Sequence, residues 1–333
     1  MSLVTGKLSN DLLEDLVFKY ITYKRKDIIT GAAVGEDNAL VDFGDEVAIL
    51  STDPITGAVN GIGSLAVNIS CNDVSTSGSE PIGLLITILA PPETTYEDIE
   101  QIMKDAGETA AKLNVEIMGG HTEITDAVNK IVISTTAIGK IKKRKLQNSN
   151  NIKVGDKVLM TKSTGIEGTS ILLKDLENYF MDKMDKDMIR EGQNYSSLIS
   201  VLKEGEIGGE IGINYMHDIT EGGVLGAVWE AHKAINKGIK IKKDLIPITE
   251  ATKELCRILE INPLRLISSG SMLMIANDNQ IEMLRERFEK ENIKLTIIGE
   301  IIEEGIYMDT DGEIEVIQPP EADELYRALG KFN

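Results

Sequence analysis

The stretch Met216-His217-Asp218-Ile219-Thr220-Glu221-Gly222-Gly223 combines a histidine, two carboxylates and paired glycines beside an apolar segment. Asp218 and Glu221 are three positions apart, a spacing that would place both on one face of a first helical turn opened by the glycines. Such a pair suits metal or phosphate binding. An N-cap formed by Asp218 or Thr220 would explain the same residues without any function.

A second stretch, Gly119-Gly120-His121-Thr122-Glu123, repeats this combination after an apolar run that ends at Met118. Paired glycines allow backbone N–H groups to approach a phosphate closely. We therefore expect a loop in which Gly119 and Gly120 hold phosphate, with His121 and Glu123 as metal ligand and base. A hairpin loop whose glycines only provide unusual dihedrals is the alternative.

Three further polar stretches carry carboxylates: Gly35-Glu36-Asp37-Asn38, Ser51-Thr52-Asp53 and Cys71-Asn72-Asp73. Two carboxylates about 4 Å apart repel each other by roughly 1 to 4 kcal/mol, so a cluster of them needs a cation. Magnesium prefers oxygen ligands and is the natural partner. The alternative is that each acid is a surface turn or cap residue. We place Asp53 in a Thr-Asp-Pro turn.

The chain of 333 residues is long enough for two domains. A basic and then polar stretch, residues 140–151, resembles a connection between them. We therefore expect one domain over residues 1–150 and a second over residues 151–333.

The composition, 42% hydrophobic and 27% charged, is that of a folded globular protein. A formal net charge of −19 repels polyanions, so nucleic-acid binding is not expected, although a magnesium-bound nucleotide is compatible with it. The only two cysteines, Cys71 and Cys256, lie far apart and do not indicate a disulfide scaffold or a zinc site. No apolar run is long enough to span a bilayer, and we expect a cytoplasmic protein.

Hydrophobic periodicity predicts the elements that carry these stretches. A capping-box spacing in Thr94-Thr95-Tyr96-Glu97 predicts a helix that continues through Leu113, and residues 61–77 form another, with Asn72 and Asp73 near its carboxyl end. Further helices are expected over residues 168–176 and 280–291, and strands over residues 46–50, 82–89, 131–138, 157–162, 271–276 and 295–301. Lys162 precedes a glycine-containing turn that lacks the P-loop spacing. We expect the Lys162 side chain to neutralise a phosphate.

In this order the stretches resemble the superfamily of aminoimidazole ribonucleotide (AIR) synthetase, selenophosphate synthetase, thiamine-monophosphate kinase and the hydrogenase maturation protein HypE. The resemblance runs over nearly the whole chain. The six segments that carry it are 35–39, 52–53, 72–81, 119–122, 155–158 and 217–223.

The resemblance implies a two-domain α+β fold of the PurM-like type, with a carboxyl-terminal α/β sandwich. It implies a homodimer that pairs the amino-terminal sheets, with ATP near that interface and a small-molecule acceptor. Magnesium would be held by Asp37, Asp53, Asp73, Asp218 and Glu221. Nucleotide would be bound by Gly119, Gly120, Thr122, Lys162 and Asn72, and His121 and Glu123 would be catalytic.

Departures from the family patterns narrow the function. The chain ends Gly330-Lys331-Phe332-Asn333, without the terminal cysteine of HypE-type proteins, so we do not expect their chemistry in cis. Selenophosphate synthetases use a cysteine or selenocysteine near the amino terminus, but no cysteine precedes Cys71 in this sequence. AIR synthetases have Gly-Thr-Lys shortly after the first metal-binding aspartate, whereas Asp53 is followed by Pro54. His121 stands where thiamine-monophosphate kinases usually have Asp.

The closest likeness is to HypE-like, AIR synthase-related proteins. We expect an ATP- and magnesium-dependent phosphotransferase or ligase that acts on an unidentified small acceptor. The alternative is a nucleotide-binding scaffold for a maturation factor, without catalysis of its own.

Overall fold

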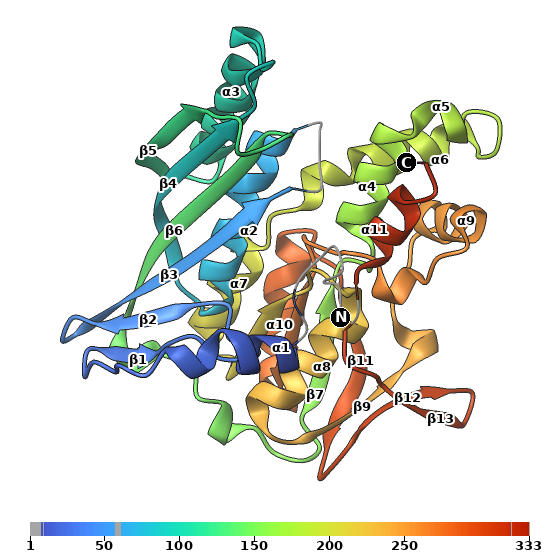
Figure 1. Ribbon diagram of the computed structural model, residues 1–333. Helices are drawn as coiled ribbons and strands as arrows, with labels where there is room; N and C mark the ends of the chain where they lie inside the picture. Colours follow the sequence, from blue (N-terminus) through green and yellow to red (C-terminus); the bar gives the residue numbers. More distant parts are fainter. Residues whose placement is uncertain (1–7, 9, 57–60, 321, 333) are drawn as a thin grey trace.

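The computed structural model describes residues 8, 10–56, 61–320 and 322–332, which form two β-sheets surrounded by helices (Figure 1). Among these residues no helix is long and apolar enough to cross a membrane. The mixed α+β architecture with two sheets agrees with the expected fold class.

The first sheet has six strands in the order β1-β2-β3-β6-β4-β5. All neighbours are antiparallel except β4 and β5, which are parallel. Helices α2 and α3 lie behind this sheet in Figure 1, whereas α1 lies beside its β1 end. The elements are α1 (Asn10–Leu16), β1 (Ile28–Thr30), β2 (Ala39–Asp42), β3 (Glu46–Ile55), α2 (Ile62–Thr76), β4 (Glu80–Ala90), α3 (Tyr96–Lys112), β5 (Glu116–Ile124) and β6 (Val132–Lys142).

Both predicted helices of this part are present. In α2 almost every side chain is buried, because it packs against the sheet, α3 and the second half of the chain. The capping box of α3 is formed by Thr95 and Asp98, one residue later than we predicted from Thr94 and Glu97. A shift by one residue occurs because Thr94 and Thr95 are both good N-caps, and only the path of the chain selects between them.

The predicted turn at Asp53 is wrong. Strand β3 continues through Asp53 and Pro54 to Ile55 and pairs with β6 over this whole length. Proline is tolerated there because β2 pairs only with residues 47–50 of β3, which leaves the other edge of β3 open at Pro54.

The predicted loop at residues 119–123 is also wrong. Strand β5 continues through these residues, with His121 paired to Thr87 of β4. A Cβ atom at Gly120 would lie 1.8 Å from the carbonyl oxygen of Ile86, so glycine is required here by the close approach of two strands.

The second sheet has seven strands in the order β13-β12-β9-β11-β7-β10-β8, antiparallel except for the pair β9 and β12. Its strands are β7 (Lys157–Thr161), β8 (Tyr215–Asp218), β9 (Gly238–Lys242), β10 (Met272–Ala276), β11 (Leu295–Ile302), β12 (Ile306–Thr310) and β13 (Glu313–Val316). The helices of this half are α4 (Ile166–Asp175), α5 (Glu177–Phe180), α6 (Lys186–Asn194), α7 (Leu202–Ile211), α8 (Gly223–Ile235), α9 (Glu250–Leu259), α10 (Asp278–Lys290) and α11 (Glu324–Leu329).

Helices cover both faces of the second sheet. Alternate strand residues such as Val158 and Tyr215 pack with α8, whereas Leu159 and Met216 pack with α7 and α10 on the other face. This arrangement is the α/β sandwich expected for the carboxyl-terminal half.

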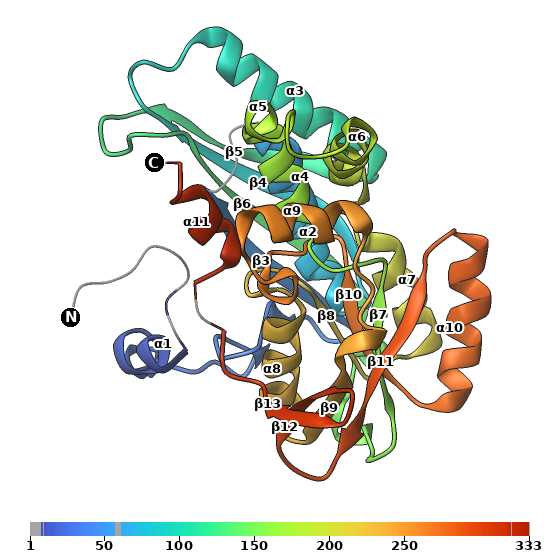
Figure 2. The ribbon, with the colours of Figure 1, turned by 90° about the vertical axis from the view of Figure 1, so that its right-hand side faces the viewer.

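One hydrophobic core joins the two halves of the chain. It contains side chains of α2, α3 and the first sheet together with side chains of α4, α6 and α9, and these helices lie side by side in Figure 2. The domain boundary at residue 150 stays a prediction, although each sheet is built from one side of it.

Candidate functional site

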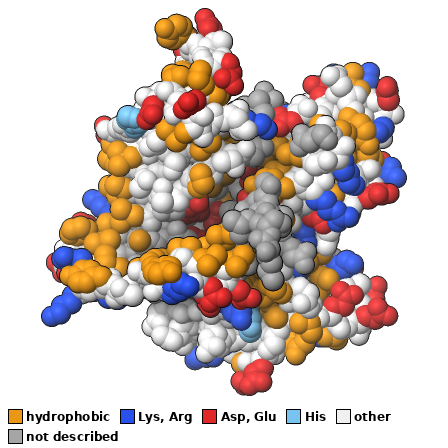
Figure 3. Space-filling view, viewed as in Figure 1, with side chains coloured by type: hydrophobic (Ala, Val, Ile, Leu, Met, Phe, Trp, Pro, Cys, Tyr) orange, Lys and Arg blue, Asp and Glu red, His pale blue; other side chains and the backbone are white. Residues whose placement is uncertain are grey.

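Four of the five predicted metal ligands converge between the two sheets. Asp53 lies on β3, Asp73 near the carboxyl end of α2, and Asp218 at the end of β8, while Asp37 comes from the turn before β2. Acidic side chains are visible at the bottom of a hollow in the middle of the face shown in Figure 3. Helix α2 brings these elements together because it packs against both β3 and β8.

Hydrogen bonds fix the amino-terminal part of this cluster. Ser51 lies two residues before Asp53 on the same face of β3, and its hydroxyl donates to Asp73 Oδ2 at 2.5 Å. The Asn38 amide donates to the backbone carbonyl of Asp73 at 2.7 Å and so ties the turn that carries Asp37 to the end of α2. Since that end of a helix has a negative partial charge, it favours a cation as well.

Asp218 is the residue of the cluster that most needs a partner. It is 1% exposed, and neither of its carboxylate oxygens has a hydrogen-bond partner among the described residues. Burial, and then the negative charge of Asp37, raise the pKa of Asp218 to about 8. The pKa of Asp73 is raised as well, by burial and then by Asp53 and Asp218.

His217 lies between two acids. Its Nδ1 is 2.6 Å from Asp37 Oδ2 and its Nε2 is 3.0 Å from Glu230 Oε2 on α8. Burial lowers the pKa of His217, but Asp37 and Glu230 outweigh burial and raise it well above its usual value. A doubly protonated ring donates from both nitrogens and has no lone pair for a metal. His217 therefore orients Asp37, although both lie within ligand distance of Asp218.

The donor set fits a magnesium ion. Carboxylate oxygens are the ligands that this cation prefers, and the unpartnered oxygens of Asp218 lie in a cluster in which burial and neighbouring acids raise the pKa of Asp73 and of Asp218. A cavity of about 210 Å³ adjoins Asp37 and is lined also by Asn38 and Tyr215. Asn38 Oδ1 and the Tyr215 hydroxyl are buried beside this cavity and have no hydrogen-bond partners among the described residues.

Glu221 lies in a different group of side chains. Asp218 ends β8 and α8 begins only at Gly223 after an N-cap at Gly222, so the predicted shared helical turn and the N-cap at Asp218 or Thr220 are wrong. Glu221 Oε1 accepts a hydrogen bond from the hydroxyl of Tyr326 on α11 at 2.9 Å. The charge of Glu221 also raises the pKa of Asp323 and Glu167, so these acids are its neighbours.

The glycine–histidine stretch lies at the edge of the first sheet. His121 Nε2 is 3.2 Å from Glu123 Oε2, and their side chains are 64% and 52% exposed. Strands β6 and β4 separate β5 from Asp53 on β3. His121 pairs with Thr87, whose side chain points away from the buried face of β4, whereas Asp53 and Ser51 face α2. This chain therefore does not bring His121 and Glu123 to the carboxylate cluster.

Two of the residues predicted to bind nucleotide form hydrogen bonds with one backbone segment. The Asn72 side chain donates to the carbonyl of Ile199 and accepts from the amide of Val201. The Lys162 ammonium donates to the carbonyls of Leu198, Ser200 and Gly270, and it pairs with the buried Glu204 at 2.7 Å. Asn72 thus binds residues 199 and 201 of this segment, and Lys162 binds residues 198 and 200.

Sequence reasoning missed the residues that support the cluster. Ser51 and Asn38 stand inside quoted stretches, but only the fold shows that they hold Asp73. Glu230 and Tyr326 lie outside every motif, and no spacing signal connects them to His217 or Glu221.

Comparison with known proteins adds family information to this geometry. Residues 35–141 match the model for the AIR synthase related protein, N-terminal domain, and residues 153–310 match the model for the C-terminal domain. A putative hydrogenase expression/formation protein of Methanocaldococcus jannaschii is 30% identical and aligns over 97% of this chain and 96% of its own length.

Two HypE proteins are also similar to this chain. The carbamoyl dehydratase HypE of Escherichia coli is 24% identical over 80% of this chain and 81% of its own. The crystal structure of hydrogenase maturation protein HypE in complex with ATP superimposes with a TM-score of 0.71 at 23% identity, covering 96% of this chain and 97% of that one. The fold is therefore the two-domain fold of these proteins.

Proposed function

Because this chain belongs to the family of AIR synthase-related proteins, we propose that it is an ATP- and magnesium-dependent enzyme that transfers or activates a phosphoryl group on a small acceptor. The observation that carries the proposal is the buried carboxylate of Asp218, unpartnered among the described residues and surrounded by three further acids. The ATP complex of the similar HypE protein supports the choice of nucleotide.

In this proposal Asp37, Asp53, Asp73 and Asp218 hold magnesium. Glu221, which lies beside Tyr326 of α11, is proposed as a further ligand. The ion supplies neutralisation of the phosphate charge. The protein supplies position: His217 orients Asp37, Ser51 orients Asp73, and Asn38 holds the turn against α2.

We further propose that the protein acts in the cytoplasm as a homodimer built on the first sheet. The outer face and edge of that sheet expose Ile82, Leu85, Met118 and Ile124 at 42 to 53%. His121 and Glu123 share this surface, so a base role for them, and phosphate contacts from Gly119, Gly120 and Thr122, would belong to a site completed by the second copy.

Two kinds of acceptor are compatible with this proposal. A kinase would pass the phosphoryl group to a phosphate or hydroxyl oxygen. A dehydratase of the kind named for the similar E. coli protein would activate a carboxamide oxygen and then expel it as phosphate. The second candidate function, a nucleotide-binding scaffold, requires the same cluster but no turnover.

The test measures ADP and phosphate released from magnesium-ATP by the full chain. Candidate acceptors are thiamine monophosphate, aminoimidazole precursors and a carbamoylated thiol. We expect release that depends on one acceptor and falls about a hundredfold in Asp73→Asn, because a ligand that places the ion is lost. Asp182→Asn, at an exposed position, is the matched control and should not change release.

Binding is measured separately by thermal unfolding. ATP with magnesium at about 100 times its dissociation constant should stabilise the protein by roughly 2.7 kcal/mol, and Asp73→Asn should abolish this effect. Saturable binding without turnover would favour the scaffold. No stabilisation of the unaltered chain, or an equal effect in Asp73→Asn, would contradict the proposed site itself.

A further inference from the structure

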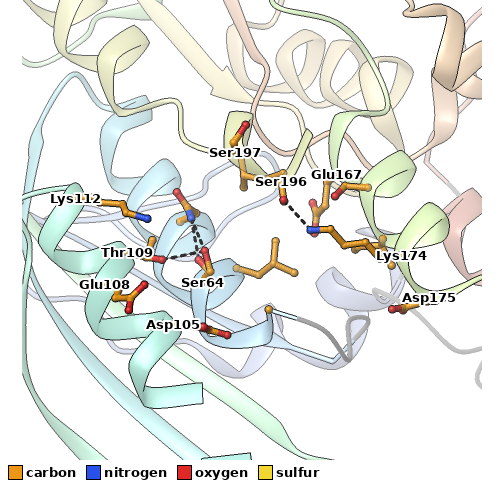
Figure 4. A pocket seen from close by; sticks show the side chains of 16 residues that line it. Ser64, Asp105, Glu108, Thr109, Lys112, Glu167, Lys174, Asp175, Ser196 and Ser197 are labelled. Carbon is orange, nitrogen blue, oxygen red and sulfur yellow. Dashed lines mark hydrogen bonds between the residues drawn. The ribbon is translucent and has the colours of Figure 1, made fainter. Parts of the chain in front are cut away.

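A second cavity, of about 290 Å³, lies where the two halves of the chain meet. Its walls come from α2 and α3 on one side and from α4 and the short 3₁₀ helix at Tyr195–Leu198 on the other (Figure 4). Its position on α2 separates it from the carboxylate cluster. Ser64 and Asn68 line it on the helix face that turns toward the second half, whereas Asp73 points to Ser51 on β3.

The cavity has a negative formal charge. Its lining includes four acids and two lysines, so it carries −2 when all are ionised; they are Asp105, Glu108, Glu167, Asp175, Lys112 and Lys174. The net charge of −19 on the whole chain adds to the attraction for cations.

Glu167 is the acid at the buried wall of this cavity. It is 4% exposed, and its Oε2 has no hydrogen-bond partner among the described residues. Figure 4 shows its side chain extending from α4 toward the cavity. Burial raises the pKa of Glu167 to about 7, the neighbouring Ser269 opposes that rise, and the charges of Asp323 and Glu221 add to it.

The other polar groups offer mainly acceptors. The hydroxyl of Thr109 donates to Ser64 at 3.0 Å, and that of Ser170 donates to the carbonyl of Gln193 at 3.0 Å, so Thr109 and Ser170 keep lone pairs rather than protons. Ser64 accepts from Thr109 and from the Asn68 amide at 3.4 Å and keeps its own proton. The Lys174 ammonium is already bound to the hydroxyl of Ser196 at 2.7 Å. A ligand that brings its own donors matches this lining.

We propose that this cavity binds a small organic amine, a short diamine or amino alcohol, whose ammonium group reaches the carboxylate of Glu167. A second N–H or O–H group of the ligand would donate to the hydroxyl oxygen of Thr109, and an oxygen or neutral amine of the ligand would accept from the hydroxyl of Ser64. Ser64 and Asn68 place this cavity on a different face of α2 from Asp73 of the proposed magnesium–nucleotide site, and Glu167 is its point of approach to Glu221. An occupant would bridge α3 and α4 and so tie the two halves of the chain together.

The experiment titrates the full chain with 1,4-diaminobutane in a calorimeter, with no nucleotide or magnesium present. We expect saturable binding to one site per chain. Glu167→Gln keeps the shape of the side chain and should weaken the affinity by about tenfold or more, because one charge-assisted hydrogen bond is lost. Lys174→Gln should strengthen the affinity, because a positive charge near a cation is removed.

Two control variants test whether the diamine binds in this cavity. Glu177→Gln on the adjacent α5 is exposed and should leave the affinity unchanged. Asp73→Asn should also bind the diamine normally, so that failure of the nucleotide site and failure of this one give different results. Melting temperatures confirm that Glu167→Gln and Lys174→Gln are folded. Absence of diamine binding, or binding of inorganic phosphate that is lost in Lys174→Gln, would overturn the proposal.

Discussion

His217 and Asp218 are consecutive residues of β8, and their polar atoms lie within 4.8 Å of each other and of Asp37, yet their surroundings differ. His217 has an acid at each ring nitrogen, and the two acids keep it charged. Asp218 has no hydrogen-bond partner among the described residues, and burial with nearby acids opposes its ionisation. Two consecutive strand residues therefore have different roles in the proposed site: His217 positions Asp37, whereas Asp218 is a proposed metal ligand.

Asp218 should make the metal-free protein less stable as the pH rises. The pKa of this carboxyl rises from the ordinary aspartate value of 3.8 to about 8 in the folded chain, so the folded state holds the proton more tightly. Stability then falls between about pH 4 and pH 8, since the folded state binds more protons than the unfolded state across that range. Asp218→Asn should be more stable than the parent at pH 8.5 by roughly 1 to 3 kcal/mol, because ionisation is removed.

Urea unfolding in a chelator at pH 5 and pH 8.5 measures this effect. The difference between variant and parent should be small at pH 5 and large at pH 8.5. Asp182→Asn provides the exposed control. An equal decline of stability with pH in Asp218→Asn and in the parent would show that this carboxylate is not the group that titrates.

We expect the main contribution of Lys162 to be to the stability of the fold and not to nucleotide binding. Its ammonium pairs with Glu204, which is 1% exposed, and binds three carbonyls. Lys162→Met leaves that carboxylate buried without its cation and should lower the free energy of unfolding by about 3 to 5 kcal/mol. Chemical denaturation measures this loss.

The double variant Lys162→Met, Glu204→Met is the matched comparison, because it removes both charges and should recover much of the stability. A stable Lys162→Met protein with weakened ATP binding would instead favour the phosphate role that the sequence suggests for this lysine.

Strands β3 and β5 show why short motifs mislead at the scale of the element. Pro54 and the pair Gly119–Gly120 are turn formers by local preference. In the sheet, Pro54 occupies an open edge, and Gly120 occupies a contact too close for any other residue. Pairing with neighbours overrides the local preference in both cases.

Gly120→Ala should therefore disrupt the β4–β5 pair. The added Cβ would meet the backbone oxygen of Ile86 at 1.8 Å, and that oxygen cannot move without breaking the sheet. We expect a loss of roughly 2 to 4 kcal/mol in unfolding free energy, within the range of severe backbone and packing changes. Thermal and urea unfolding provide the measurement.

Gly107→Ala is the control for glycine replacement in general. It lies inside α3, and a Cβ there meets nothing within 4 Å. Alanine should stabilise that helix by about 0.5 to 1 kcal/mol. Similar effects of the two replacements would contradict the strand-contact explanation for Gly120.

In the molecule as a whole, residues 198–201 lie at the junction of its two halves. Asn72 binds them from α2 of the first half, and Lys162 binds them from the end of β7 in the second half. Asn72→Ala leaves a buried carbonyl and a buried amide without partners, each worth about 1 to 3 kcal/mol. The loss should be concentrated at the junction of the halves.

Hydrogen exchange is the measurement that locates this loss. We expect faster exchange at residues 198–201 and in α2 of Asn72→Ala, with β11 and β7 in the middle of the second sheet unchanged. Asn68→Ala, one turn away on α2 with its amide bound to Ser64, is the control. Uniformly faster exchange over the whole chain would show that Asn72 supports global stability and not the junction.

Local patterns in the sequence indicate which segments are apolar, where several of the longer helices and strands lie, and which residue types carry the chemistry. Helices over residues 62–76 and 96–112 and strands over residues 80–90 and 272–276 follow from periodicities that act over a few residues. The order of six acidic and glycine-rich stretches was sufficient to indicate the family, which the matches over residues 35–141 and 153–310 show.

Which of the acids meet depends on the tertiary fold. Asp37, Asp53, Asp73 and Asp218 converge, whereas Glu221 lies with Tyr326, and His121 lies at the far edge of the first sheet. Strand register and the packing of α2 against both sheets set these positions, and they depend on contacts between residues far apart in the chain. Local spacing contains no information about such contacts, and for that reason the supporting residues Ser51 and Glu230 could not be found from the sequence.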